Sequence, residues 1–208
     1  MNPALQTQLE HLVDDLARHD LAVVDHFLSP DEVNDLLMLD AFQGDLLQLK
    51  RAGIGKDEGK QINEAIRGDY IQWIDRERAP APVQRYLAKL DALRDTVNRE
   101  LYAGIRDAEI HLTRYPIGTF YKRHLDQFKK DDHRKLSVIC YLNKDWQAAQ
   151  GGQLRVYPAD APIDIFPEAG RLVCFRSDKL EHEVLPATRE RLSITGWMIN
   201  QLAELRYL

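Results

Sequence analysis

The sequence predicts an α+β fold, in which N-terminal helices support a double-stranded β-helix, or cupin-like jelly roll, of eight strands. The first observation behind this prediction is that apolar residues recur mostly at helical spacing before Gly104. The second is that short β-rich segments follow Gly104 at roughly ten-residue spacing, with turn residues between them. Eight antiparallel strands in one compact unit suit a jelly roll, which presents a pocket between its two sheets at one open end.

The N-terminal region opens with a helix and a short strand. Leucine and valine residues recur at helical spacing from Leu5 onward, which predicts an amphipathic helix that ends near His19. The stretch 21–27 that follows suits a short strand.

A second helix is predicted from its capping signals. Ser29 suits the N-cap, Pro30 the first helical position, and Glu32 is placed to close a capping box. We expect this helix to run to about Leu49.

The next region combines a loop, a strand and a third helix. Residues 50–64 are rich in Gly, Lys, Asp and Glu and have no apolar period, which predicts a mobile loop or a long hairpin arm. Alternation in residues 69–75 indicates a strand. Pro80 and Pro82 then open a third helix, whose apolar residues continue to Leu101.

The eight strands of the jelly roll are read from β-rich segments separated by turn residues. They are centred on residues 109–115, 119–125, 135–142, 152–158, 163–166, 171–176, 181–186 and 191–199.

Composition limits the class of protein. The chain has 208 residues, 44% of them hydrophobic, which is enough for one good core. A formal net charge of -5 argues against a nucleic-acid-binding protein, and neither a secretory signal nor a transmembrane run is expected. Cys140 and Cys174 lie in apolar strand-like segments, so we expect small buried thiols rather than a disulfide, and a cytoplasmic location.

A metal site is predicted from two histidines and one aspartate. On an extended strand, positions i and i+2 point to the same face, so His124 and Asp126 can both reach one ion. His182 would complete three ligands, because the second and seventh strands of a jelly roll lie side by side. Two histidines and one carboxylate that leave the opposite positions open suit ferrous iron in non-haem oxygenases.

An anion site is predicted beside the metal. Arg191, Ser193, Thr195 and Trp197 alternate onto one face of the last strand, which would direct an arginine into the pocket. A buried guanidinium needs an anionic partner.

The chain resembles the 2-oxoglutarate- and Fe(II)-dependent oxygenases, and within them the prolyl hydroxylases that act on hypoxia-inducible factor. The similar segments are IRGDYIQWID, YPIGTFYKRHLD, YLNKDW, GGQLRVYP, RLVCFRSDKLEHEVLP and RLSITGWM, in the family's order from Ile66 onward. Bacterial relatives of this group include a hydroxylase of translation elongation factor Tu, and the chain resembles those. The resemblance implies hydroxylation of a prolyl residue in a protein, with release of succinate and CO2.

The resemblance also implies roles for individual residues. His124, Asp126 and His182 would bind Fe(II), and the cosubstrate 2-oxoglutarate would chelate the iron beside O2, with ascorbate as the reductant. Arg191 would bind the far carboxylate of 2-oxoglutarate. Further cosubstrate contacts fall on Tyr141, Thr195 and Tyr115, and substrate contacts fall on Tyr121, Arg134 and Trp197.

The resulting domain organisation is a single oxygenase domain over residues 1–208. Its expected parts are helical support over 1–104 with a mobile finger loop at about 50–75, a catalytic jelly roll over 105–199, and a C-terminal tail over 200–208.

Two alternatives remain open on the residues alone. One is an oxygenase of the same superfamily that acts on a free amino acid or another small molecule. The other is a non-catalytic jelly-roll module, or a zinc protein with the same three ligands, because zinc also accepts two histidines and a carboxylate. A buried arginine so close to the last ligand argues against the zinc protein, which needs no anion anchor.

Overall fold

The computed structural model describes residues 3–46, 49–52, 66–127 and 132–202. Its helices are α1 (Pro3–His19), α2 (Pro30–Leu37), α3 (Asp40–Gln43), α4 (Ala81–Leu101) and the short 3-10 helix η3 (Ala148–Gln150). Within these residues, no helix is long and apolar enough to cross a membrane.

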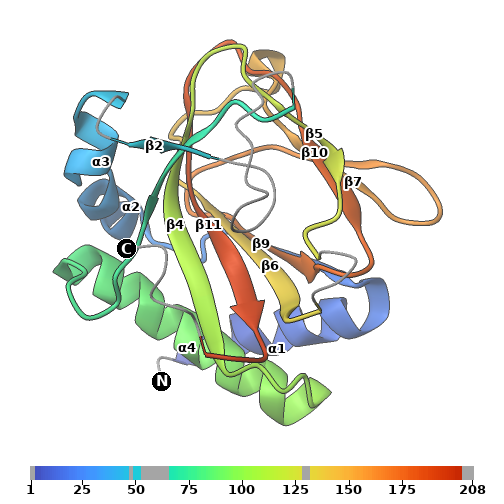
Figure 1. Ribbon diagram of the computed structural model, residues 1–208. Helices are drawn as coiled ribbons and strands as arrows, with labels where there is room; N and C mark the ends of the chain where they lie inside the picture. Colours follow the sequence, from blue (N-terminus) through green and yellow to red (C-terminus); the bar gives the residue numbers. More distant parts are fainter. Residues whose placement is uncertain (1–2, 47–48, 53–65, 128–131, 203–208) are drawn as a thin grey trace.

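The strands form two antiparallel sheets that face each other. They are β1 (Leu21–Val24), β2 (Lys50–Arg51), β3 (Tyr70–Trp73), β4 (Asp107–Tyr115), β5 (Tyr121–His124), β6 (Arg134–Tyr141), β7 (Leu154–Tyr157), β8 (Ile163–Ile165), β9 (Leu172–Arg176), β10 (Glu181–Val184) and β11 (Arg191–Ile199). In the described part of the chain, the large sheet has the order β1-β9-β6-β11-β4-β3-β2 and the small sheet the order β5-β10-β7-β8 (Figure 1). Strands β4 to β11 are the eight predicted strands, and the α+β jelly roll is confirmed.

Two hydrophobic cores share the large sheet. One core packs the apolar faces of α1, α2 and α4 against one side of the sheet, where Ile194 and Met198 of β11 lie. The other lies between the two sheets and includes Tyr141 and Val156. Figure 1 shows α1 and α4 along one face of the large sheet, with β5, β10 and β7 on the opposite side. The helices therefore support the sheet from behind and leave the space between the sheets for a site.

The helix predicted from Ser29 begins as expected but ends early. Ser29 caps α2 in a complete capping box with Glu32, as its sequence predicts. The expectation that this helix continues to about Leu49 was wrong, because the backbone is extended at Leu39 and a separate short helix, α3, follows. Arg114 of β4 donates hydrogen bonds to carbonyl oxygens of Ala41 and Gly44, at 3.3 and 2.8 Å. A contact with a strand 70 residues away therefore holds the end of α3, and local sequence cannot reveal it.

The segment expected to form a finger loop is described only at its two ends. Residues 50–51 form β2, which pairs with β3 at the edge of the large sheet. Residues 53–65, on which the prediction of a mobile loop mainly falls, lie outside the described residues.

Gly196 allows β11 and β4 to pack closely. A Cβ atom at this position would lie 2.1 Å from the carbonyl oxygen of Glu109 and 2.6 Å from Cδ1 of Ile110. Because a backbone oxygen cannot move aside alone, we expect Gly196→Ala to lower the free energy of unfolding by about 3 kcal/mol or more.

Chemical denaturation measures this effect. Gly104→Ala is the comparison, because Gly104 has open space around it but a φ of +65°. That conformation costs an L-residue only about 1–2 kcal/mol. Equal losses in the two variants would contradict the packing argument.

Candidate metal and cosubstrate site

A cavity between the two sheets collects the residues that the sequence singled out. Its lining includes His124, Asp126, His182 and Arg191, which come from β5, the turn after it, β10 and β11. Tyr115, Tyr121, Thr195 and Trp197 also line it. Of the remaining predicted residues, Tyr141 is fully buried next to Arg191, and Arg134 stacks on Trp197.

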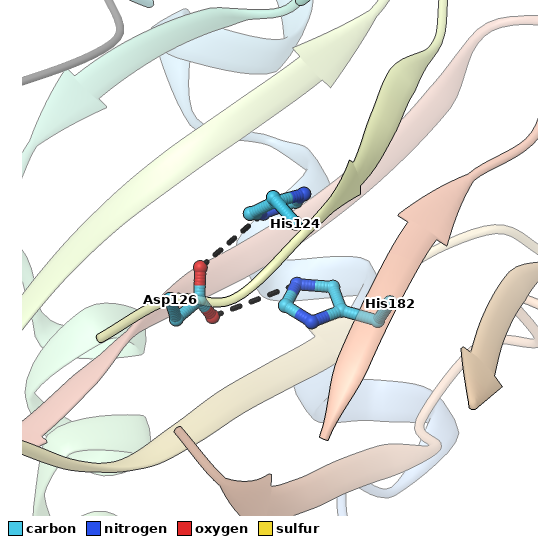
Figure 2. Close-up of side chains that lie close together, drawn as sticks. All are labelled: His124, Asp126 and His182. Atoms are coloured by element: carbon cyan, nitrogen blue, oxygen red, sulfur yellow. Dashed lines mark ion pairs between the residues drawn. The ribbon is translucent and has the colours of Figure 1, made fainter. Parts of the chain in front are cut away.

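The predicted metal ligands lie close together. One ligand atom from each of His124, Asp126 and His182 lies within 4.8 Å of the others. The Nε2 atom of His124 is 3.4 Å from one carboxylate oxygen of Asp126, and Nε2 of His182 is 3.6 Å from the other. Figure 2 shows the Asp126 carboxylate between the two imidazoles. This spacing suits three donors around one ion.

Pairing of neighbouring strands brings the two histidines together. His182 of β10 is the register partner of His124 of β5, which confirms the expected proximity of the second and seventh strands. Asp126 differs from expectation, because β5 ends at His124 and Asp126 lies in the bend that follows. Its carboxylate still reaches the same point as the histidines.

Hydrogen bonds to the backbone orient both imidazoles. Nδ1 of His124 lies 2.7 Å from the carbonyl oxygen of Lys122, and Nδ1 of His182 lies 3.3 Å from that of Leu180. Because a carbonyl oxygen only accepts, these contacts place the proton on Nδ1 and leave the Nε2 lone pair for a metal. Burial lowers the pKa of His182 to about 4, so this ring is neutral at physiological pH.

The Asp126 carboxylate is held in its ionised form. Burial raises the pKa of this group, but the nearby His182 and His124 and a hydrogen bond from Ser137 outweigh it and bring the pKa well below its ordinary value. The Ser137 hydroxyl lies 2.6 Å from Asp126 and 2.9 Å from the hydroxyl of Ser177. A pair of serines thus orients the ligand carboxylate from behind.

Arg191 is a buried cation that pairs with no carboxylate of the described residues. Its side chain is 2% exposed, and one Nη donates to the hydroxyl of Tyr141 at 3.1 Å. Among the described residues, its Nε has no hydrogen-bond partner and no carboxylate pairs with it. The rings of Tyr115 and Tyr141 lie 5.1 and 4.8 Å from the guanidinium. A buried guanidinium with an unused donor fits a ligand that carries a carboxylate.

The residues expected on the substrate side lie beside the predicted metal ligands. Tyr121 stacks on the His124 ring, with centroids 3.7 Å apart. The Arg134 guanidinium lies 3.5 Å from the centre of a Trp197 ring and donates to the carbonyl oxygen of Asp126 at 3.2 Å. These contacts connect the aromatic wall to a metal ligand.

Sequence reasoning missed part of the pocket. Asp69 is buried and accepts two hydrogen bonds from Arg67, at 2.6 and 2.8 Å, and the Arg67 guanidinium lies over the Tyr121 ring. His111 also lines the cavity. The alternation of β4 could have identified His111, because it has the same parity as Tyr115. Nothing local indicated that Arg67 and Asp69 pair inside the pocket.

Fold and site together define a non-haem iron oxygenase: a jelly roll that presents two histidines, one carboxylate and a buried arginine in one cavity. A family model described as the 2OG-Fe(II) oxygenase superfamily matches residues 110–199. Human prolyl hydroxylase EGLN3 is 31% identical over 91% of this chain and 82% of its own length. The chain therefore belongs to this superfamily, which uses Fe(II), 2-oxoglutarate and O2. Membership of this superfamily favours iron over zinc as the ion that these three side chains could hold.

Within the superfamily the chain is similar to prolyl hydroxylases. Human Egl nine homolog 1 is 34% identical over 99% of this chain, which spans 51% of that relative's length. The crystal structure of a Pseudomonas putida prolyl-4-hydroxylase has a TM-score of 0.84 and 44% identity, over 93% of this chain and 100% of the other. A Trichoplax adhaerens prolyl hydroxylase in complex with a hypoxia-inducible factor peptide fragment has a TM-score of 0.84 and 28% identity, over 96% of this chain and 94% of the other.

Proposed function

We propose that this protein is a 2-oxoglutarate- and Fe(II)-dependent dioxygenase that hydroxylates a prolyl residue in a protein, and that elongation factor Tu is its substrate. The observation that carries the proposal is that the buried cation of Arg191, which pairs with no carboxylate in the described part of the chain, lies in the same cavity as three side chains that could hold a metal ion. A metal site alone has no need of a buried guanidinium. A cosubstrate that chelates iron at one end and carries a carboxylate at the other uses both.

Each residue has a defined task in this proposal. His124, Asp126 and His182 hold the iron, and their backbone and serine partners keep the donor atoms in place. Arg191 and Tyr141 bind the far carboxylate of 2-oxoglutarate, and Tyr115 and Thr195 line the space between. The bound iron and cosubstrate supply the oxidising chemistry, in which O2 gives one oxygen atom to succinate and the other to the new hydroxyl group. The protein binds the reactants in line and excludes water.

A protein substrate is supported by the relatives and by the mouth of the site. One similar structure contains a peptide fragment of hypoxia-inducible factor bound to a prolyl hydroxylase. In this chain Tyr121, Trp197 and Arg134 form an aromatic and cationic wall next to the metal ligands, and an aromatic wall suits a proline ring. Within residues 50–75, the part that lies outside β2 and β3 would act as the finger that covers the bound peptide in a gating role.

The two cysteines support a cytoplasmic location, and the two hydrophobic cores support a single domain. Cys140 and Cys174 are buried free thiols whose pKa values are raised by burial, which supports a reducing cytoplasm, where ascorbate serves as the reductant. Both hydrophobic cores lie against one sheet, which supports a single domain over residues 1–208.

The test is hydroxylation of purified elongation factor Tu. Incubation with this protein, Fe(II), ascorbate and 2-oxoglutarate should add one oxygen atom to a proline, as measured by peptide mass spectrometry, with one succinate formed per modified proline. Reactions without 2-oxoglutarate are the control. Hydroxylation of free amino acids with no change in elongation factor Tu would favour the small-molecule alternative instead.

A further inference from the structure

His111 is a buried histidine that the metal site does not use. It lies on β4 with no exposed surface and faces Thr195 of β11 in the strand register. Its ring lies 4.9 Å from that of Trp73 and 5.7 Å from that of Trp197. Together with Trp197 it lines the cavity that contains the metal ligands.

Two nitrogen atoms in this part of the cavity have no hydrogen-bond partner among the residues that the structure describes. Among the described residues, neither Nε2 of His111 nor Nε1 of Trp197 has a partner, although both atoms are buried. The indole N–H can only donate. A buried donor without a partner destabilises the folded protein, and native structures rarely retain one without a reason.

The neighbouring hydroxyl group decides the tautomer of His111. Nδ1 lies 2.8 Å from the hydroxyl oxygen of Thr113, and this is the hydrogen bond that the hydroxyl makes within the described residues. If Thr113 donates to Nδ1, the proton of the imidazole is on Nε2, and this Nε2–H is the one group of the pair left without a partner. If Nδ1 donates instead, both the hydroxyl proton and the Nε2 lone pair lack partners. The first arrangement is favoured, so His111 presents an N–H donor.

The charge state of His111 agrees with this assignment. Burial and the nearby Arg67 and Arg134 lower its pKa to about 3, despite the opposing effect of Asp69. The ring is therefore neutral at physiological pH and offers one N–H group.

We propose that His111 and Trp197 bind one carbonyl oxygen of the substrate peptide through their Nε2–H and Nε1–H groups. This inference rests on the proposed function. The cosubstrate is excluded as the partner because its keto-acid end is engaged by the metal and its far carboxylate by Arg191. Arg191 faces Tyr115 in the register, roughly 13 Å along the strands from His111 and Thr195. The N–H groups of His111 and Trp197 are therefore left for the protein substrate. A peptide carbonyl is the acceptor that every protein substrate carries.

The test compares binding and stability in His111→Leu, which keeps an apolar side chain but removes the donor. The KM for elongation factor Tu should rise about 3- to 10-fold, the effect of one lost hydrogen bond, while the KM for 2-oxoglutarate stays unchanged. Trp197→Phe should act in the same direction. His111→Gln, which restores an N–H near the position of Nε2, should recover much of the lost affinity. The exposed His11, replaced by leucine, is the matched control.

Thermal unfolding of the ligand-free protein separates this role from a structural one. His111→Leu removes the unsatisfied Nε2–H but also removes the acceptor of the Thr113 hydroxyl. The two effects oppose each other, so the Tm should stay within a few degrees of the wild-type value, whereas loss of a histidine that supports the fold would lower it further. An unchanged KM for elongation factor Tu, or a Tm lower by about 10 °C or more, would overturn the proposal. Failure of His111→Gln to restore affinity would also overturn it. If the wild-type protein leaves elongation factor Tu unmodified, the substrate proposed above is wrong, and the Tm comparison alone decides the role of His111.

Discussion

His124→Ala is expected to abolish iron-dependent succinate release, with a loss of about 1000-fold or more. The imidazole supplies one of three donors that lie within 4.8 Å of one another, and two remaining donors hold a divalent ion poorly. Loss of a residue that merely supports a ligand lowers metal affinity or activity by about 10- to 100-fold, so loss of the ligand itself should exceed that.

Two measurements are needed for this variant. Iron affinity is measured by calorimetric titration, and succinate formation is measured at saturating 2-oxoglutarate. His11→Ala, on the exposed face of α1, is the matched control. A His124→Ala protein that is folded by circular dichroism and binds iron as tightly as the wild type would exclude His124 from the metal site.

Arg191→Lys is expected to raise the KM for 2-oxoglutarate about 100-fold and to leave iron affinity unchanged. A guanidinium can donate two parallel hydrogen bonds to one carboxylate, whereas an ammonium is a point charge that cannot reproduce this geometry. Lysine would also lose the bond that Arg191 donates to the Tyr141 hydroxyl, which helps to fix the guanidinium between two aromatic rings.

Steady-state kinetics with varied 2-oxoglutarate, together with iron titration, test this prediction. Arg176→Lys is the control, because Arg176 lies in the same sheet on β9, which β6 separates from β11, and pairs with Asp178 at the surface. A KM for 2-oxoglutarate within twofold of the wild type would show that the cosubstrate carboxylate binds elsewhere. A parallel loss of iron affinity would indicate instead that the substitution distorts the whole cavity.

Much of this architecture could be predicted because it depends on local periodicity. The spacing of β-rich segments predicted strands β4 to β11, and Ser29 and Glu32 predicted the start of α2. The pairing of β5 with β10 followed from jelly-roll topology and brought His124 beside His182. Each of these features is repeated over several residues or fixed by one short motif.

The features that could not be predicted depend on contacts between distant segments. The end of α3 is held by Arg114 of β4, and the Asp126 carboxylate is oriented by Ser137 of β6. The buried ion pair of Arg67 and Asp69 lies in the cavity because β3 joins the large sheet beside β4. The partners of Arg114 and Asp126, and the position of the Arg67–Asp69 pair in the cavity, are set by the folded topology, for which a single sequence carries no signal.

The two faces of strand β11 have separate roles. Arg191, Thr195 and Trp197 face the reaction chamber, while Ile194 and Met198 contact the helices behind the sheet. Selection for a new substrate and selection for heat resistance should therefore enrich substitutions at alternate positions of this one strand. An engineer could tune catalytic preference and durability here almost independently, provided that Gly196 is left unchanged.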